Sequence, residues 1–381
     1  MDFTYDEELE MVRGMARDFA EKELFPRATK HDRQEAMDAD IFEKLAELGF
    51  WGLTVPEEFG GAGMGNLPLA VVLIELNRGC ASTGVTVSVH NSLIGAPLRK
   101  FGSEEQKAEW LPRLATGEII GAYCLTEPDA GSDAAALRTS ATVDGDDFIL
   151  NGTKIWVTNG GIAGLYIVYA RTNPDVSNSK GITAFLVPRD TEGLTVGKHE
   201  LKTGIRGSST TEIILENVRV PKTSVLGDVD RGFPIALDTL DGGRIGIAAQ
   251  AVGIAEACLE ASVKYAHERH QFDRPIGQFQ AIQWKLSDMS TRIEAARLLT
   301  CKAAWQRDQG AFTNREAAQA KLFASQTANF CADEAVQIHG GAGYTDDFHV
   351  ERLFRDARIT EIYEGATDIQ RLVIARQLLA V

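Results

Sequence analysis

The chain has 381 residues, which is more than one hydrophobic core usually takes, so two or three domains are expected. Its 44% hydrophobic and 24% charged residues are ordinary for a globular protein. The formal net charge of −15 argues against nucleic acid as the main partner, because little basic surface is left to displace counterions. An anionic small molecule is not excluded, since it needs only a few local cations.

The five cysteines include no C-x-x-C pair, which indicates reduced thiols and neither a disulfide framework nor a metal site. The first ten residues are acidic and lack the apolar core of a signal peptide. No uninterrupted apolar run reaches membrane-spanning length. We therefore expect no bound metal, no membrane insertion and a cytoplasmic location.

Residues 1–118 carry apolar residues at helical spacing, which predicts an N-terminal all-α domain. Ser103 and Gln106 have the spacing of a capping box, so a helix is expected from there to about Leu114. His90 has no second histidine at metal spacing and is interpreted as a core histidine.

Residues 119–230 change to short segments rich in β-branched and aromatic residues, separated by turn signals. Strands without helices between them predict a small β-barrel or sandwich and argue against a nicotinamide-binding parallel sheet. Two stretches offer contacts for a flat polar ligand. One is Tyr123–Leu137, with Gly131 and Ser132, and the other is Trp156–Asn159, with an indole face and the Thr158 hydroxyl.

Residues 231–381 return to long helical patterns, which predicts a four-helix bundle whose last helix follows Glu364. Gly242 and Gly243 lie inside the first helix, where each costs about 1 kcal/mol relative to alanine, so something is expected to approach the backbone there. Asp241 and Arg244 flank them and have the spacing of a local helix salt bridge.

The stretch 362–370, IYEGATDIQ, is the strongest candidate for chemistry. Glu364 would serve as a general base if a partly apolar site tuned its pKa. Gly365 permits a close ligand approach, and Thr367 or Asp368 is expected to cap the following helix.

Residues 355–375, RDARITEIYEGATDIQRLVIA, resemble the C-terminal signature of acyl-CoA dehydrogenases, especially the short-chain or butyryl-CoA type and short branched-chain relatives. The Tyr123 and Trp156 stretches resemble the flavin motifs of that family, in the same order. The resemblance covers nearly the whole chain. Residues 366–368 depart from the common form, which leaves the acyl preference more open than the reaction. The domains expected are 1–118, 119–230 and 231–381.

The resemblance implies that Glu364 removes the α-proton of an acyl-CoA, with the thioester carbonyl bound by the N–H of Glu364 and a ribityl hydroxyl of FAD. The β-hydride goes to flavin N5, the product is a trans-2-enoyl-CoA, and electrons pass to electron-transfer flavoprotein. Isovaleryl-CoA dehydrogenases place their base at the position of Gly243 instead, so only one base position is filled here.

The resemblance also implies the binding residues. FAD contacts are expected from Tyr123, Leu125, Thr126, Gly131, Ser132, Trp156, Thr158, Thr367 and Asp368. The FAD of a neighbouring subunit is expected to contact Arg269, Phe272, Gln280, Gln337, Gly340 and Gly341, which implies a homotetramer built as a dimer of dimers. Acyl-CoA contacts are expected from Ser132, Asp241, Arg244, Tyr363 and Gly365.

Three alternatives share these motifs: an acyl-CoA oxidase, a dehydrogenase of carrier-protein-bound acyl groups, and a silent flavoprotein that serves as an assembly subunit. Oxidases of the family are usually longer, and an intact Glu364 argues against the silent protein. The likeness to short-chain enzymes favours acyl groups of four to six carbons, while a 2-methyl branch stays open.

Overall fold

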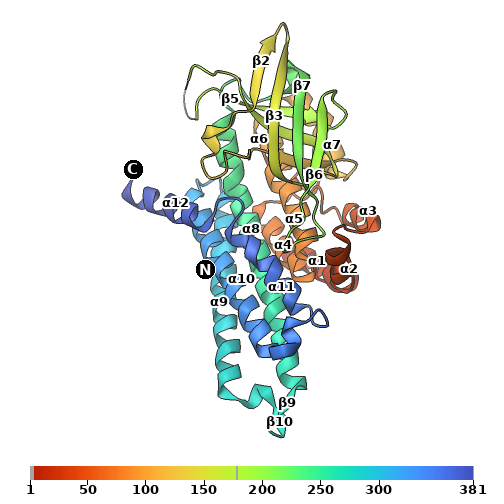
Figure 1. The fold of residues 1–381 in the computed structure, drawn as a ribbon, viewed down its shortest axis with the longest axis vertical. Coiled ribbons are helices and arrows are strands. Elements are labelled where there is room, and N and C mark those ends of the chain that lie inside the picture. The colour runs from red at the N-terminus through yellow and green to blue at the C-terminus, as the bar shows by residue number, and fades with distance from the viewer. Residues whose placement is uncertain (1–3, 177–178, 381) are drawn as a thin grey trace.

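The computed structural model describes residues 4–176 and 179–380. Helices, then strands, then helices follow one another along the chain, and the strands of the middle part gather at one end of an elongated molecule (Figure 1). The predicted succession of a helical, a β and a second helical part is confirmed.

The N-terminal part is helical, and its helices at residues 66–79 and 81–89 are buried against the C-terminal part. The helix bounds are α1 Glu7–Phe19, α2 Phe25–Gln34, α3 Ala39–Glu47, α4 Asn66–Gly79, α5 Ala81–Val89, α6 Ala96–Phe101 and α7 Glu104–Ala115, with π-helical turns at Ala20–Leu24 and His90–Gly95. The capping box of Ser103 and Gln106 is present at α7, as predicted. His90 is a satisfied core residue, since it accepts from the Gly121 N–H and contacts the Leu114 carbonyl.

The middle strands form one sheet that folds over its own core. Its strands are β1 Ile120–Cys124, β2 Ser140–Asp144, β3 Asp147–Thr158, β4 Ala163–Arg171, β5 Ile182–Pro188, β6 Leu194–His199, β7 Thr210–Pro221 and β8 Val225–Leu226. The order is β6-β7-β3-β2-β4-β5-β8, with β1 parallel to β4. β2 and β4 pair only at Ser140 and Arg171, and Phe148, Tyr166 and Phe185 pack between the two halves. The predicted barrel or sandwich is confirmed.

The C-terminal part is built on three long helices. Its elements are α8 Gly232–Glu268, β9 His270–Gln271, β10 Arg274–Pro275, α9 Gln280–Asp308, α10 Asn314–His339, α11 Val350–Arg358 and α12 Thr367–Leu379. In the described residues, α8 alone is long and apolar enough to cross a membrane, but 83% of its most apolar window is buried among the other helices. Burial of this kind identifies α8 as the core helix of the bundle.

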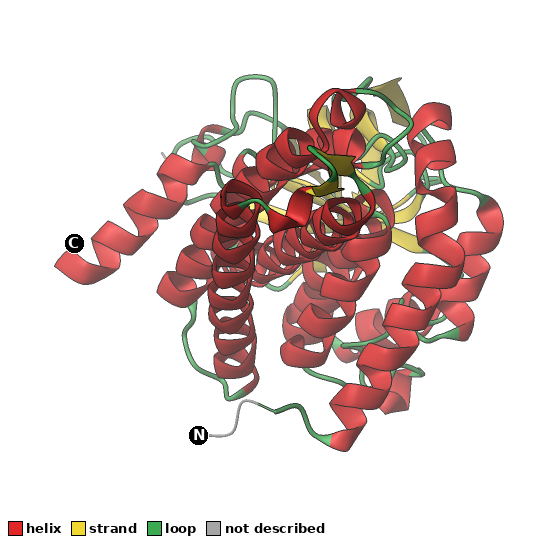
Figure 2. Ribbon diagram, turned by 90° about the horizontal axis from the view of Figure 1, so that it is seen from below, coloured by secondary structure: helices red, strands yellow, loops and turns green. Residues whose placement is uncertain are grey.

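The last helix differs from the expectation of a fourth bundle member. α12 extends away from the body (Figures 1 and 2), only Gln370 of it is buried, and Leu378 and Leu379 are exposed. α11 packs against α8 and α10, and α12 contacts α10 where it leaves the body. Uncovered apolar surface of this kind is typical of a contact site, and the periodicity of one sequence does not distinguish such a helix from one packed within the bundle.

The segment 202–210 connects the sheet to the C-terminal helices. A Cβ on Gly204 would lie 2.2 Å from the Arg355 carbonyl oxygen, and the Ile205 N–H donates to the Asp356 carboxylate at 2.5 Å. Ile205 adopts a left-handed conformation, with φ of 44°. The segment therefore ties the sheet to α11.

A buried ion pair holds the loop after β1 against β3. Lys154 is completely buried, and its Nζ donates to Glu127 at 2.7 Å and to the Leu125 carbonyl at 3.1 Å. Glu127 also accepts from the N–H groups of Arg138 and Thr139. Both ends of the loop are thereby attached to the sheet.

Glu127→Gln should lower the free energy of unfolding by about 3 kcal/mol, because it leaves the Lys154 charge buried without a counter-charge. Chemical denaturation monitored by circular dichroism measures this. Asp129→Asn in the same loop is the control, since its pair with Arg138 is largely exposed and should matter little. Equal stability of the two variants would contradict the structural role of the buried pair.

Candidate active site

Glu364 lies in a sharply turned segment between α11 and α12. Glu364 has a φ of 50° and Gly365 a φ of 90°, so two consecutive residues are left-handed. That conformation costs a residue with a side chain about 1 kcal/mol or more, so the surrounding contacts must hold it.

Two side chains hold the carbonyls of this turn. Lys321 Nζ donates to the Gly365 carbonyl at 2.7 Å, and Gln370 Nε2 donates to the same oxygen at 2.7 Å and to the Glu364 carbonyl at 3.2 Å. A Cβ on Gly365 would lie 2.4 Å from Gln370 Nε2, so glycine is required. The turn is thus fixed by α10 and α12 together.

The turn directs the Glu364 carboxylate against the backbone of α8. A Cβ built on Gly243 would lie 2.1 Å from Glu364 Oε2 and 2.8 Å from Leu93 Cδ2. Oε2 is buried and has no hydrogen-bond partner in the described residues. The close approach predicted from the helical glycines is confirmed for Gly243, while a Cβ on Gly242 would meet only Arg307, at 3.6 Å.

The charge state of Glu364 is set by opposing effects. Burial raises the pKa of Glu364 to about 7, and the cations Lys321 and Arg244 limit the rise. Arg244 is itself paired with Asp241 at 2.5 Å, which is the local helix salt bridge that the spacing indicated. A carboxyl group with this pKa exchanges a proton near neutral pH.

Tyrosine side chains lie on both sides of Glu364. The Tyr363 hydroxyl donates to Gln250 of α8, whose Nε2 donates to the Ala81 carbonyl. The Tyr123 hydroxyl, at the end of β1, is buried without a partner in the described residues. Burial raises the pKa of Tyr123 well above its usual value, and Tyr169 and Glu364 add to the rise.

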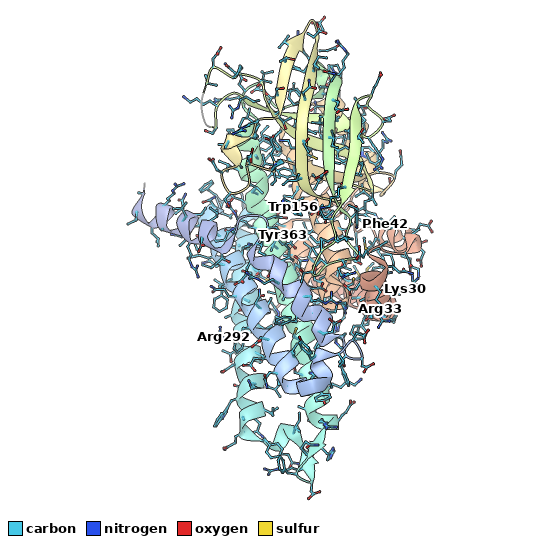
Figure 3. All side chains as sticks on the ribbon, viewed as in Figure 1. Lys30, Arg33, Phe42, Trp156, Arg292 and Tyr363 are labelled. Atoms are coloured by element: carbon cyan, nitrogen blue, oxygen red, sulfur yellow. The ribbon has the colours of Figure 1, made fainter. Side chains whose placement is uncertain are left out.

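Trp156 presents an open aromatic face at the end of the sheet that is nearer the helices. A bulge in β3 interrupts the pairing between Lys154 and Val157, and Trp156 there has a φ of 57° and is 58% exposed. The Ile155 N–H donates to the Thr126 carbonyl at 3.0 Å, which joins the two flavin-like stretches. Figure 3 shows Trp156 and Tyr363 where the strands meet the helices. An exposed indole next to strand-end backbone suits a flat heterocycle such as the isoalloxazine of FAD.

The other predicted contacts of the β part and of α12 differ in burial and in their local partners. Leu125 is buried and Thr158 half-buried, whereas Gly131 and Ser132 are exposed in the loop after β1. Neither Thr367 nor Asp368 caps α12, contrary to expectation. The Thr367 hydroxyl donates to the Glu361 carbonyl, and Asp368 pairs with Arg371 at the surface.

The remaining predicted contacts lie at the opposite end of the bundle. They are exposed and gather where α8 and α10 end and α9 begins: Arg269, Phe272, Gln280, Gln337, Gly340 and Gly341. Phe272 is 87% exposed in a left-handed turn between β9 and β10. From Gly243 to Arg269 a continuous helix rises by about 40 Å. The structure of one chain therefore does not bring the two sets together.

Large cavities do not identify the site. One of about 760 Å³ lies between α7 and the end of β7, and another of about 400 Å³ is lined by Thr54 and Arg99. Neither touches Glu364 or Trp156. Both lack a buried, unpaired acid or base, so the unpaired carboxylate is the better guide to chemistry.

Two residues of the site were missed from the sequence. Lys321 and Gln370 are buried, and both hold the turn at Glu364. Lys321 has a visible signal, because it occupies a buried helical position in register with Ala317, Ala324 and Ala328. A lysine on such a small-residue face is unusual and indicates a specific partner.

Comparison with known proteins covers nearly the entire chain. Family models match in order: the acyl-CoA dehydrogenase N-terminal domain over residues 6–118, the middle domain over 122–218 and the C-terminal domain over 230–379. This chain belongs to the acyl-CoA dehydrogenase family. Members of the family depend on FAD, and a similar glutaryl-CoA dehydrogenase of Mycobacterium smegmatis, 33% identical with a TM-score of 0.93, was solved with FADH2. The matched region covers 99% of this chain and 96% of the chain in that structure.

Individual relatives point to the short-chain type. The human short-chain specific acyl-CoA dehydrogenase is 51% identical over 370 residues, covering 97% of this chain and 90% of that protein. The butyryl-CoA dehydrogenase structure from Megasphaera elsdenii has a TM-score of 0.97 at 43% identity, with full coverage of both chains. A chain from a structure described as the electron transferring flavoprotein of Acidaminococcus fermentans has a TM-score of 0.98 at 46% identity, also with full coverage. This acyl-CoA dehydrogenase is therefore an oxidoreductase with short-chain-type activity.

Gly243→Ala should abolish flavin reduction by butyryl-CoA, because the added methyl group occupies the place of the Glu364 carboxylate. Gly242→Ala is the matched control, since its methyl group makes an ordinary contact and alanine favours a helix by about 1 kcal/mol. Stopped-flow absorbance under anaerobic conditions measures the reduction. Equal rates for the two variants would show that the close approach does not matter.

Proposed function

We propose that this protein removes the α-proton of a short-chain acyl-CoA with Glu364 and yields a trans-2-enoyl-CoA. The observation that carries the proposal is the buried, unpaired Oε2 of Glu364, held against Gly243 in a strained turn. The position of Trp156 near the same junction supports it.

The backbone of the turn offers a second function. Within the described residues, the Glu364 N–H donates no hydrogen bond. The carbonyls of Glu364 and Gly365, in contrast, both accept hydrogen bonds. A free N–H beside the base suits a thioester carbonyl, whose oxygen gains negative charge as the α-proton leaves. One residue thus supplies both the base and a donor to the developing enolate.

FAD, when bound, supplies the acceptor for the hydride of the β-carbon. Tyr123, Leu125, Thr126, Trp156 and Thr158 are the residues that would hold its ring system, with Gly131, Ser132, Thr367 and Asp368 at the edges of the site. The pair Lys154–Glu127 fixes the loop that carries Leu125 and Thr126. This chain's part is to orient the reactants and to move the proton.

For the substrate, we propose contacts from Ser132, Asp241, Arg244, Tyr363 and Gly365. The buried guanidinium Nε of Arg244 has no partner within the described chain, which leaves a donor for a polar group of CoA. Leu93 packs close to Gly243 and Glu364, which limits the depth available to an acyl chain. This crowding and the likeness to short-chain enzymes support acyl groups of four to six carbons.

The complete FAD site requires a second copy of this chain. The six exposed residues at the far end of the bundle are suited to a neighbour's cofactor, and the uncovered apolar face of α12 is available for subunit contact. We propose the homotetramer of the family on these grounds. Arg269→Ala should lower FAD content without changing the fold, as measured by flavin absorbance after purification. Full FAD content in that variant would argue against the role of Arg269.

Titration of the FAD-loaded protein with acyl-CoAs of graded length and branching, without oxygen, tests the function. Butyryl-CoA should bleach the oxidised flavin, and Glu364→Gln should stay yellow and folded with little bleaching. Normal reduction of that variant would exclude Glu364 as the base. No bleaching across the panel would favour the carrier-protein or silent alternatives.

The electron acceptor is tested with the same reduced protein. Electron-transfer flavoprotein should reoxidise it quickly and air slowly while product is bound. The similarity to a chain from a structure described as an electron transferring flavoprotein supports this partner. Fast reoxidation by air would favour the oxidase instead.

The rate of flavin reduction should rise with pH through about 7. Only the carboxylate form of Glu364 accepts a proton, and its pKa of about 7 means that this form disappears below that pH. Stopped-flow rates from pH 5.5 to 9 at saturating butyryl-CoA measure the profile. A flat profile over this range would contradict the titration of a base with this pKa.

A further inference from the structure

Lys321 is an unusual residue in this structure. Its side chain is completely buried in α10, and its Nζ donates to one acceptor, the Gly365 carbonyl, at 2.7 Å. Within residues 4–176 and 179–380 it forms no ion pair, unlike the equally buried Lys154, which is paired with Glu127. A buried ammonium group without a paired carboxylate is costly, so its position calls for a functional explanation.

The acceptor of Lys321 is the residue that follows the proposed base. Glu364 and Gly365 are both left-handed, and the chain returns to helix at Thr367. A donor on the Gly365 carbonyl therefore fixes the peptide just beyond Glu364 and holds the turn from which the Glu364 side chain projects. Gln370 shares this oxygen, but Gln370 is neutral and Lys321 carries a charge.

We propose that Lys321 is a positioning residue that holds the turn at Glu364 through the Gly365 carbonyl and keeps a positive charge beside the carboxylate. This inference rests on the proposed role of Glu364 as the base. It predicts that α10 assists proton removal in two ways, by holding the turn at Glu364 and by placing a positive charge beside the carboxylate. Lys321 itself touches neither reactant.

The groups that face this pair come from several elements. Lys321 from α10 and Arg244 from α8 face Glu364 as cations, and Tyr123 from β1 and the adjacent Tyr363 face it as phenols. Lys321 in turn faces Glu364, Arg244 and Glu361. Asp241 neutralises Arg244 by pairing with it, so Lys321 is the cation whose charge is not compensated by its own ion pair.

These charges determine in which direction the loss of Lys321 shifts the pKa of Glu364. A cation stabilises the carboxylate form, so loss of the Lys321 charge should raise the pKa of Glu364 further above about 7. The rise of the reduction rate would then move to higher pH. Burial lowers the pKa of Lys321 to about 8, so the charge is present at neutral pH.

The test uses FAD-loaded protein and four substitutions. Lys321→Met removes donor and charge, Lys321→Gln keeps an amide donor without the charge, Lys321→Arg keeps both, and Gln370→Met removes the neutral donor to the same carbonyl. Lys302→Met on the exposed surface of α9 is the control for losing a helical lysine. Butyryl-CoA is the probe for reduction rates from pH 5.5 to 9.5.

The midpoint of the rate profile should move up by about one pH unit or more in Lys321→Met and Lys321→Gln. It should stay in place in Lys321→Arg, Gln370→Met and Lys302→Met, although Gln370→Met should reduce flavin more slowly. A residue that merely stabilised the fold would lower the amount of active protein without moving the midpoint.

A second measurement does not depend on turnover. The infrared carboxyl band that is lost in Glu364→Gln can be titrated with pH in each variant, and its midpoint should shift as the rate profile does. If Lys321→Met does not fold, the other two variants still test the proposal. The midpoint should shift in Lys321→Gln and stay in place in Lys321→Arg. Unshifted infrared midpoints in the charge-free variants, with Glu364→Gln inactive, would overturn this inference alone. A fully active Glu364→Gln would overturn the proposed base and, with it, the role of Lys321.

Discussion

The contact on which the site depends is the approach of the Glu364 carboxylate to the backbone of α8 at Gly243. No side chain fits between them, since even a Cβ would lie 2.1 Å from Oε2. α8 is 37 residues long and closely packed among its neighbours, so its backbone is held in place on the side that faces Glu364. The turn at Glu364 is held from the other side by Lys321 and Gln370, and its left-handed conformation directs the carboxylate at the α8 backbone.

The electrostatics of the site follow from this burial. Loss of water would by itself keep Glu364 protonated at neutral pH, and a fully compensated ion pair would make it too weak a base. The pKa of Glu364 lies between these limits for two reasons. Arg244 is paired with Asp241, and Lys321 donates to a carbonyl and not to the carboxylate. Nearby but unbonded cations leave the pKa at about 7, which suits proton transfer.

Much of the architecture could be predicted from the sequence, because periodicity and turn residues are local properties. The three-part fold, the α7 capping box and the close approach at Gly243 are examples. What could not be predicted depends on contacts distant in sequence. Lys321 acts on a residue 44 positions away, and segment 202–210 docks on α11 about 150 positions later. Motif resemblance marks the residues that are expected to contact ligands and does not mark the residues, such as Lys321, that hold them in place.

The predicted cofactor contacts fall into two separate sets because of the length of α8. One set lies on β1, β3, the loop after β1 and the start of α12, and the other lies at the end of α8, about 40 Å along the helix from Gly243. An extended dinucleotide does not reach across that distance, and a buried helix does not bend to shorten it. If both sets bind FAD, the far set of one copy must serve the near set of another. Cofactor retention would then depend on subunit contact, and the uncovered apolar face of α12 is a physical reason for such contact to form.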